Sequence, residues 1–169
     1  MLDEEFDDYD MVVMLDPDMF VRKGMDNNIL TDVTGIGMHN DVQTRVFNGL
    51  RRKHPSLMDP KYPFWGGAIY RLTRDQRQRL RKNIREDEII CFGRKQWEGE
   101  DEGIMHRLAT LAQMEISYIP GWEWCHCSYR DGVERSSMIH VRTKVTAAGP
   151  KRTKIENYRD LVERGLIEE

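Results

Sequence analysis

Asp16 and Asp18, separated by a single proline, have the residue type and spacing of a metal site. They directly follow the apolar run Met11–Leu15, which predicts a buried strand that ends in a turn. Ligands collect outside the carboxyl ends of strands in open α/β sheets, and carboxylate oxygens suit Mg²⁺ or Mn²⁺. The pattern suits a cation site, but Asp-Pro-Asp is common, and taken alone it favours an acidic turn that holds no metal.

A second acidic cluster, at residues 98–102, directly precedes the amphipathic segment 104–112. Acidic groups at a helix N-terminus are stabilised by the helix dipole, which is one account of this cluster. Four acids in five positions also repel one another, and a carboxylate held at a helix start can act as a general base. From the residues alone, both the helix-stabilising and the catalytic interpretation stay open.

Two further groups of metal-binding residue types lie near the C-terminal end. Cys125-His126-Cys127 offers thiol and imidazole ligands, but the sequence holds only three cysteines and no second pair to close a zinc site. Buried cysteines beside a packed tryptophan are the favoured interpretation. His140 lies in a predicted strand over residues 138–141, where a partly buried, hydrogen-bonded histidine is more usual than a metal ligand.

These side chains need a scaffold of strands and helices. We expect the segments 11–15, 68–72 and 116–119 to be neighbouring buried strands of one mixed sheet. Thr73 should cap a helix over 74–85 whose arginines lie in solvent. A terminal helix is expected over 154–164, with Ile155, Tyr158, Leu161 and Val162 facing inward. A short helix is also expected at 25–33. The expected fold class is α/β, a mixed sheet flanked by helices.

Composition limits the class of protein. The 169 residues suit a single domain over 1–169, in which 143–169 form a basic loop and a terminal helix. A net charge of −3 gives no indication of a nucleic-acid partner. No apolar run approaches the ~20 residues that span a membrane, and no secretory signal is apparent, so we expect a cytoplasmic protein.

Four segments, in this order, resemble metal-dependent glycosyltransferases of the GT-A fold, and in particular the β-1,4-galactosyltransferase group. Asp16-x-Asp18 resembles the DxD motif of that fold. Tyr62-Pro63-x-x-Gly66-Gly67, followed by a predicted strand and helix, resembles the acceptor-side segment of the group. Trp97-x-Gly99-Glu100-Asp101-Glu102 is similar to its Trp-Gly-Gly-Glu-Asp-Asp-Asp segment, although Glu98 replaces the first glycine.

The fourth segment, Met138-Ile139-His140, resembles the Met-Ile-x-His stretch that supplies the group's last metal ligand, although the histidine comes one residue earlier here. The resemblance implies that Asp16, Asp18 and His140 hold Mn²⁺, or alternatively Mg²⁺. Asp18 would bind the metal directly, and Asp16 would bind it through water or contact the donor. The implied donor is a nucleotide-diphosphate sugar, most often UDP-linked, and the implied acceptor is a hydroxyl of a glycan or another molecule.

The same resemblance assigns roles to the second acidic cluster. Asp101 would deprotonate the acceptor hydroxyl and Glu100 would orient it, so that the configuration of the sugar inverts. Gly66 and Gly67 would let the backbone approach the donor or the acceptor. The implied substrate-contacting side chains are Trp65, Trp97 and Glu102. The alternatives are a retaining transferase and a non-catalytic domain of this fold that binds a sugar or a partner.

In the GT-A fold a βαβ unit that binds the nucleotide precedes the DxD motif, whereas only residues 1–15 precede Asp16 in this sequence. The resemblance therefore implies the catalytic and acceptor half of such a domain, without most of the N-terminal nucleotide-binding βαβ unit. Strands that are internal in the family would become sheet edges, which tend to pair with other chains. We accordingly expect either a homodimer or an N-terminal partner segment.

Overall fold

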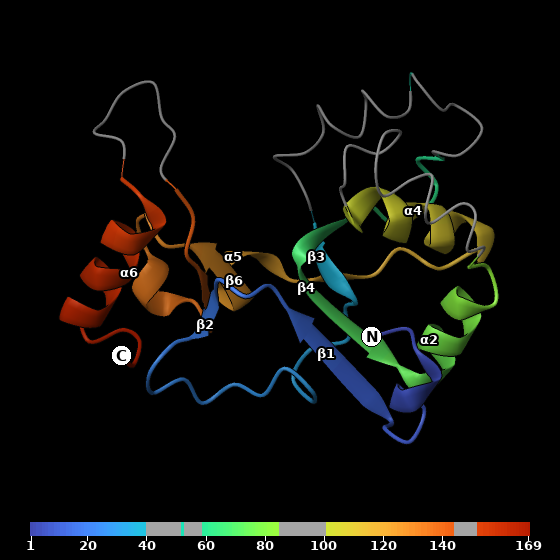
Figure 1. Cartoon of the computed structure of the whole chain (residues 1–169), viewed down its shortest axis with the longest axis horizontal. Coiled ribbons are helices and arrows are strands. Elements are labelled where there is room, and N and C mark those ends of the chain that lie inside the picture. The colour runs from blue at the N-terminus through green and yellow to red at the C-terminus, as the bar shows by residue number, and fades with distance from the viewer. Residues whose placement is uncertain (40–51, 53–58, 85–100, 144–151) are drawn as a thin grey trace. The chain divides into compact units, whose positions relative to one another are not determined.

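The computed structural model describes residues 1–39, 52, 59–84, 101–143 and 152–169 (Figure 1). The chain divides into two compact units. The first comprises Met1–Met14 and Thr34–Ile119, and the second comprises Leu15–Val33 and Pro120–Glu169. Each unit joins segments that are distant in the sequence, and each has its own sheet. The single domain expected over residues 1–169 stays a prediction.

The sheet of the first unit has four strands in the order β1-β4-β3-β5. Strand β3 runs antiparallel to β4 and parallel to β5, so the sheet is mixed, as expected. All three expected segments contribute a strand to it, but β3 lies between β4 and β5. The segment expected at 116–119 forms a strand only over Tyr118–Ile119, and Ile116 is 57% exposed. The bounds are β1 (Met11–Leu15), β3 (Gly37–His39), β4 (Trp65–Thr73) and β5 (Tyr118–Ile119).

Strand β1 has the expected bounds but not the expected burial. All five of its residues are half-buried, whereas β4 contains the fully buried Trp65, Ile69 and Leu72. The difference follows from position, because β1 lies at one end of the strand order in the described part of the sheet and β4 lies inside it. The expectation of a buried strand at residues 11–15 was therefore correct for the strand and wrong for its burial.

Helices α2 (Arg74–Arg81) and α4 (Asp101–Leu111) pack near β4, and a short 3₁₀ helix η1 (Glu4–Phe6) lies near the N-terminus (Figure 1). The Thr73 hydroxyl accepts a hydrogen bond from the backbone N–H of Gln76, as expected of a helix cap. The helix ends four residues earlier than expected. The core of this unit consists of Ile36, Trp65, Tyr70, Leu72, Leu80, Met105, Leu108, Ala109 and Met114.

Arg77 of α2 corrects the expectation that the arginines of this helix lie in solvent. Its side chain is fully buried and donates hydrogen bonds to the carbonyl oxygens of Leu72, Phe6 and Tyr9 at 2.8, 2.7 and 2.6 Å. A buried guanidinium requires such partners, because unpaired burial of its charge would be costly. Arg77 therefore ties the N-terminal segment to the end of β4.

The sheet of the second unit has three strands in the order β2-β7-β6. Strand β7 (Met138–His140) is central, antiparallel to β2 (Met19–Val21) and parallel to β6 (Cys125–Cys127). The remaining elements are α5 (Gly121–Trp124), the 3₁₀ helix η4 (Val133–Arg135) and α6 (Lys154–Glu163). The core of this unit consists of Val133, Ile139, Val141, Leu161 and Ile167.

Two expectations about this unit differ from the structure. Residues 25–33 form turns rather than a helix, since the side chain of Asn28 accepts from Leu30 N–H and that of Asp32 accepts from Asn28 N–H. Such local side-chain bonds compete with helix formation. In α6, Leu161 is buried as expected, but Ile155 is 63% exposed.

The described chain is thus a mixed α/β protein with two mixed sheets and helices, which agrees with the expected fold class at that level. The GT-A type stays a prediction. Among the described residues, no helix combines the length and the apolar character that crossing a membrane would need.

Candidate metal centre

Asp16, Asp18 and His140 converge in the second unit, as the resemblance implied. One ligand atom from each lies within 4.8 Å of the other two. The Nε2 atom of His140 lies 3.1 Å from Asp18 Oδ1 and 3.9 Å from Asp16 Oδ2. Two carboxylates and an imidazole, held at this spacing, are a donor set that fits a divalent cation.

Backbone pairing explains why residues so distant in the sequence meet. His140 ends the central strand β7, where it stands opposite Met19 of β2. The N–H of Val141 donates to the carbonyl oxygen of Asp18 at 2.8 Å, and the N–H of Met19 donates to that of Asp16 at 2.9 Å. The first bond extends the ladder beyond β2, and the second closes a tight turn. The sheet therefore fixes the backbone of all three candidate ligands.

The protonation states of Asp18 and His140 suit metal binding. Partial burial alone would raise the pKa of Asp18, but the hydrogen bond from Lys154 and the neighbouring His140 outweigh it and leave that pKa lowered. Burial lowers the pKa of His140, and the opposing effect of Asp18 does not cancel it. At neutral pH the site therefore presents a carboxylate and a neutral imidazole, which are the forms that bind metals.

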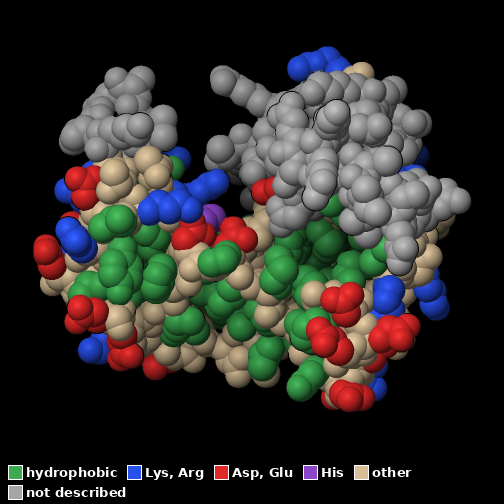
Figure 2. Space-filling view, in the orientation of Figure 1, with side chains coloured by type: hydrophobic (Ala, Val, Ile, Leu, Met, Phe, Trp, Pro, Cys, Tyr) green, Lys and Arg blue, Asp and Glu red, His purple; other side chains and the backbone are tan. Residues whose placement is uncertain are grey.

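Sequence reasoning missed Lys154, the first residue of α6. Its ammonium group donates to Asp18 Oδ2. Figure 2 shows acidic, basic and histidine side chains meeting at the surface. A lysine at a helix start carries no signal for this contact, because the contact depends on where α6 packs against the sheet.

The first unit brings together two other residues expected at a site. The backbone N–H of Gly67 in β4 donates to Glu102 Oε1 in α4 at 3.3 Å. These residues come from the second and third of the four segments that resemble the β-1,4-galactosyltransferase group. Gly66 precedes Gly67 in the same strand and is half-buried.

Trp65 differs from its expected role. Its side chain is fully buried in the core, and the indole N–H donates to the carbonyl oxygen of Ser117 at 2.7 Å. A face that is covered by the core cannot stack on a sugar, so Trp65 is a structural residue in this fold. Gly37 of the adjacent strand β3 has no room for a side chain, since a Cβ there would lie 2.8 Å from Trp65 Cβ.

The expected catalytic carboxylates stay predictions. Asp101 is the first residue of α4, so its backbone is at a helix N-terminus as expected, but its side chain is outside the description. Glu100 and Trp97 lie outside the described residues.

Cys125 and Cys127 are free thiols on β6, both half-buried. Burial raises the pKa of the Cys125 thiol to about 12, so it is protonated at neutral pH and a poor metal ligand. Its sulfur lies 3.8 Å from that of Met19. The expectation of packed cysteines agrees with this arrangement.

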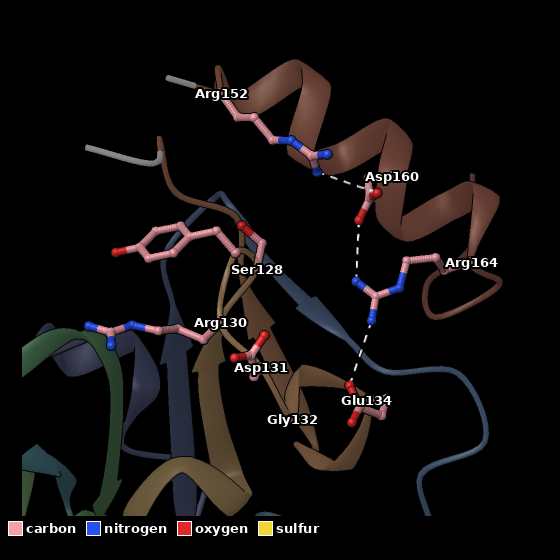
Figure 3. A pocket seen from close by; sticks show the side chains of 9 residues that line it. Ser128, Arg130, Asp131, Gly132, Glu134, Arg152, Asp160 and Arg164 are labelled. Carbon is pink, nitrogen blue, oxygen red and sulfur yellow. Dashed lines mark hydrogen bonds and ion pairs between the residues drawn. The ribbon is translucent and has the colours of Figure 1, made fainter. Parts of the chain in front are cut away.

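A polar pocket of about 360 Å³ lies beside α6 in the same unit (Figure 3). An ion-pair network crosses it: Asp160 contacts both Arg152 and Arg164, at 3.4 and 3.2 Å, and Arg164 also contacts Glu134 at 3.6 Å. The network joins α6 to η4 and thereby helps to hold the helix that carries Lys154.

No protein-family model matches this sequence, and no curated protein matches it either.

Proposed function

We propose that this chain is a metal-dependent glycosyltransferase that moves a sugar from a nucleotide-diphosphate sugar, UDP-linked in the most common case, to an acceptor hydroxyl. The observation that carries the proposal is the convergence of Asp16-x-Asp18 with His140. The resemblance assigns these three residues to one metal site, and one ligand atom from each lies within 4.8 Å of the other two. The spacing of these residues in the sequence does not by itself predict that His140 lies beside the two aspartates.

In this proposal Asp18 and His140 hold Mn²⁺ directly, and Asp16 holds it directly or through water. The nitrogen ligand favours Mn²⁺ over Mg²⁺. A bound divalent ion supplies charge neutralisation that makes the nucleotide diphosphate a better leaving group. The residues of the chain contribute a carboxylate that is ionised and an imidazole that is neutral at neutral pH, so the site is ready to bind without a prior proton transfer from Asp18.

The first unit supports the acceptor side of the proposal. The bond from Gly67 to Glu102 brings the glycine pair next to the helix that begins with Asp101. In this proposal Asp101 takes the proton of the acceptor hydroxyl and Glu100 orients that hydroxyl, which gives an inverting transfer. Glu102, already bonded to Gly67, positions the strand rather than the substrate.

The test measures UDP release from UDP-glucose, UDP-galactose, UDP-N-acetylglucosamine and UDP-N-acetylgalactosamine, each at millimolar concentration, with Mn²⁺ or with a chelator. We expect release from at least one donor with Mn²⁺ and none with the chelator. Asp18→Asn keeps the shape of the side chain and should abolish release.

The matched control is Asp26→Asn, which removes an exposed carboxylate from the same unit. It should release UDP at the wild-type rate. UDP release that persists in Asp18→Asn, or that is unchanged by the chelator, would contradict a metal-dependent transferase.

A further inference from the structure

We propose that Lys154 is a built-in cation that holds the Asp18 carboxylate in the absence of metal and competes with the metal for it. Metal uptake is then an exchange of one cation for another, and Lys154 sets the metal concentration at which the site fills. This inference rests on the metal site of the proposed function and concerns its regulation.

The contacts of Asp18 define the competition. Its Oδ2 atom accepts from the Lys154 ammonium, and its Oδ1 atom lies 3.1 Å from His140 Nε2. Both oxygens of the carboxylate are thus engaged by groups of this chain. A metal must therefore displace or repel partners on both oxygens before Asp18 becomes its ligand.

The position of Lys154 is set by its helix and not by Asp18 alone. The Thr153 hydroxyl accepts from Glu156 N–H, and the Glu156 carboxylate accepts from Thr153 N–H, so a capping box fixes where α6 begins. Asn157 of the same helix donates a hydrogen bond to the carbonyl oxygen of Arg142 at 2.6 Å, and Arg142 follows His140 by two residues. The bond from Asn157 to Arg142 holds the first turn of α6 beside the site, and the ion pair of Arg164 with Glu134 ties the other end of the helix to η4 (Figure 3).

The ammonium replaces part of the charge that a metal would supply. Asp16 and Asp18 repel each other unless a cation is nearby, and Lys154 is a cation bonded to Asp18. A divalent ion on the same carboxylate would lie within a few ångströms of the ammonium and repel it. The two cations therefore oppose each other for the same carboxylate.

The exposure of the two partners makes the exchange reversible. The Lys154 side chain is 58% exposed, whereas that of Asp18 is 23% exposed. An ammonium that is mostly in water loses little interaction free energy when it moves away from Asp18, because exposed ion pairs are weak. Lys154 should thus raise the metal concentration that is needed without blocking the site.

A role for Lys154 in positioning Asp18 would change the Kd of the metal in the opposite direction from competition. If the ammonium merely positioned Asp18 for the metal, its removal would loosen the carboxylate and weaken metal binding. If it competes, its removal frees one oxygen and removes a repulsive charge, so binding becomes tighter. The direction of the change in Kd therefore decides between the two roles.

The experiment measures the Kd of Mn²⁺ by calorimetry for the wild type, Lys154→Met, Lys154→Arg and Arg159→Met. We expect Lys154→Met to bind about 10-fold more tightly, the size that one nearby charge in a partly exposed site supplies. Lys154→Arg keeps the charge and should stay close to the wild type. Arg159→Met removes a charge from an exposed position of the same helix and should change the Kd by less than about 2-fold.

A second measurement follows the ammonium itself. Acylation of lysines, read by mass spectrometry, should increase at Lys154 when Mn²⁺ saturates the site and stay constant at the exposed Lys61. Equal or weaker Mn²⁺ binding in Lys154→Met would overturn the competition while leaving the metal site standing. Absence of Mn²⁺ binding in both the wild type and Lys154→Met would overturn the competition and the proposed metal-dependent function together.

Discussion

The backbone N–H of Val141 donates a hydrogen bond to the carbonyl oxygen of Asp18 at 2.8 Å. This bond continues the β2–β7 ladder past the end of β2, in which Met19 stands opposite His140. The relative position of Asp18 and His140 is therefore set by main-chain pairing, which persists when a side chain is replaced. A ligand can be removed from this site without dismantling the scaffold that holds the others.

The first prediction concerns that ligand set. Mn²⁺ should raise the melting temperature of the wild type, because an ion that binds only the folded state stabilises it by mass action, by about 2.7 kcal/mol at 100 times its Kd. His140→Gln should lose most of this shift, measured by differential scanning calorimetry. His126→Gln, on the neighbouring strand β6, is the matched control and should keep it. An equal shift in both variants would exclude His140 as a ligand.

The second prediction compares two apolar residues of one sheet. Ile69 is fully buried in β4, whereas Leu15 is half-buried in β1. Ile69→Ala should lower the free energy of unfolding by about 2–5 kcal/mol, as large-to-small changes in a core do. Leu15→Ala should cost less than half as much, since part of its side chain is already in water. Denaturant unfolding measures both, and a larger loss for Leu15→Ala would contradict the strand order.

The third prediction concerns Arg77, whose buried guanidinium donates hydrogen bonds to three carbonyl oxygens. Arg77→Met keeps the length of the side chain and leaves those oxygens without their donor, so it should cost about 3 kcal/mol of stability. Arg79→Met, on the exposed side of the same helix, should cost less than about 1 kcal/mol. Similar losses in urea unfolding would mean that the buried contacts contribute little.

The fourth prediction concerns pH. His106 is fully buried, its Nδ1 lies 2.8 Å from the carbonyl oxygen of Pro63, and burial lowers its pKa below the usual 6.5. Above about pH 6.5 both folded and unfolded states hold a neutral ring, and this group adds no pH dependence. Below it the unfolded state takes up the proton first, so stability falls with falling pH until the folded-state pKa is passed.

The contribution of this histidine to the slope of the unfolding free energy against pH cannot exceed about 1.4 kcal/mol per pH unit. In urea unfolding between pH 5 and 8, His106→Gln should lack the part of the slope that His106 contributes. An NMR titration that gives His106 a pKa above 6.5 would refute the assignment.

Local patterns predicted much of the scaffold. The apolar run that ends at Leu15 identified β1, and the capping residue Thr73 identified the start of α2, because both signals lie within a few neighbouring residues. Burial was predicted less well. The extent to which β1 is covered depends on its place in the sheet, and the burial of Arg77 depends on carbonyl groups of the distant N-terminal segment.

In the candidate metal site, too, local features were predicted from the sequence and long-range contacts were not. Asp16 and Asp18 were identified from their spacing, but His140 entered only through the resemblance to a family, since the register of β2 against β7 cannot be read from either strand. Lys154 was missed altogether, because its contact with Asp18 arises only after α6 has packed. Long-range pairing thus decides which of the predicted ligands meet and which cation joins them.

The last prediction concerns the proposed base. Asp101 is the first residue of α4. Asp101→Asn keeps the shape of the side chain and removes its basicity, so it should reduce sugar transfer by about 10²–10⁴-fold. Donor binding should not change, because the proposed function assigns the metal that would bind the donor to Asp18 and His140 and not to Asp101.

Asp75→Asn is the matched control, since Asp75 occupies the first turn of α2, is exposed, and has the same relation to a helix dipole. It should transfer sugar at the wild-type rate. Product analysis by NMR gives the second readout, because a base that activates the acceptor for direct attack inverts the anomeric configuration. A product that retains the configuration of the donor, or an Asp101→Asn variant of near wild-type rate, would rule out this role for Asp101.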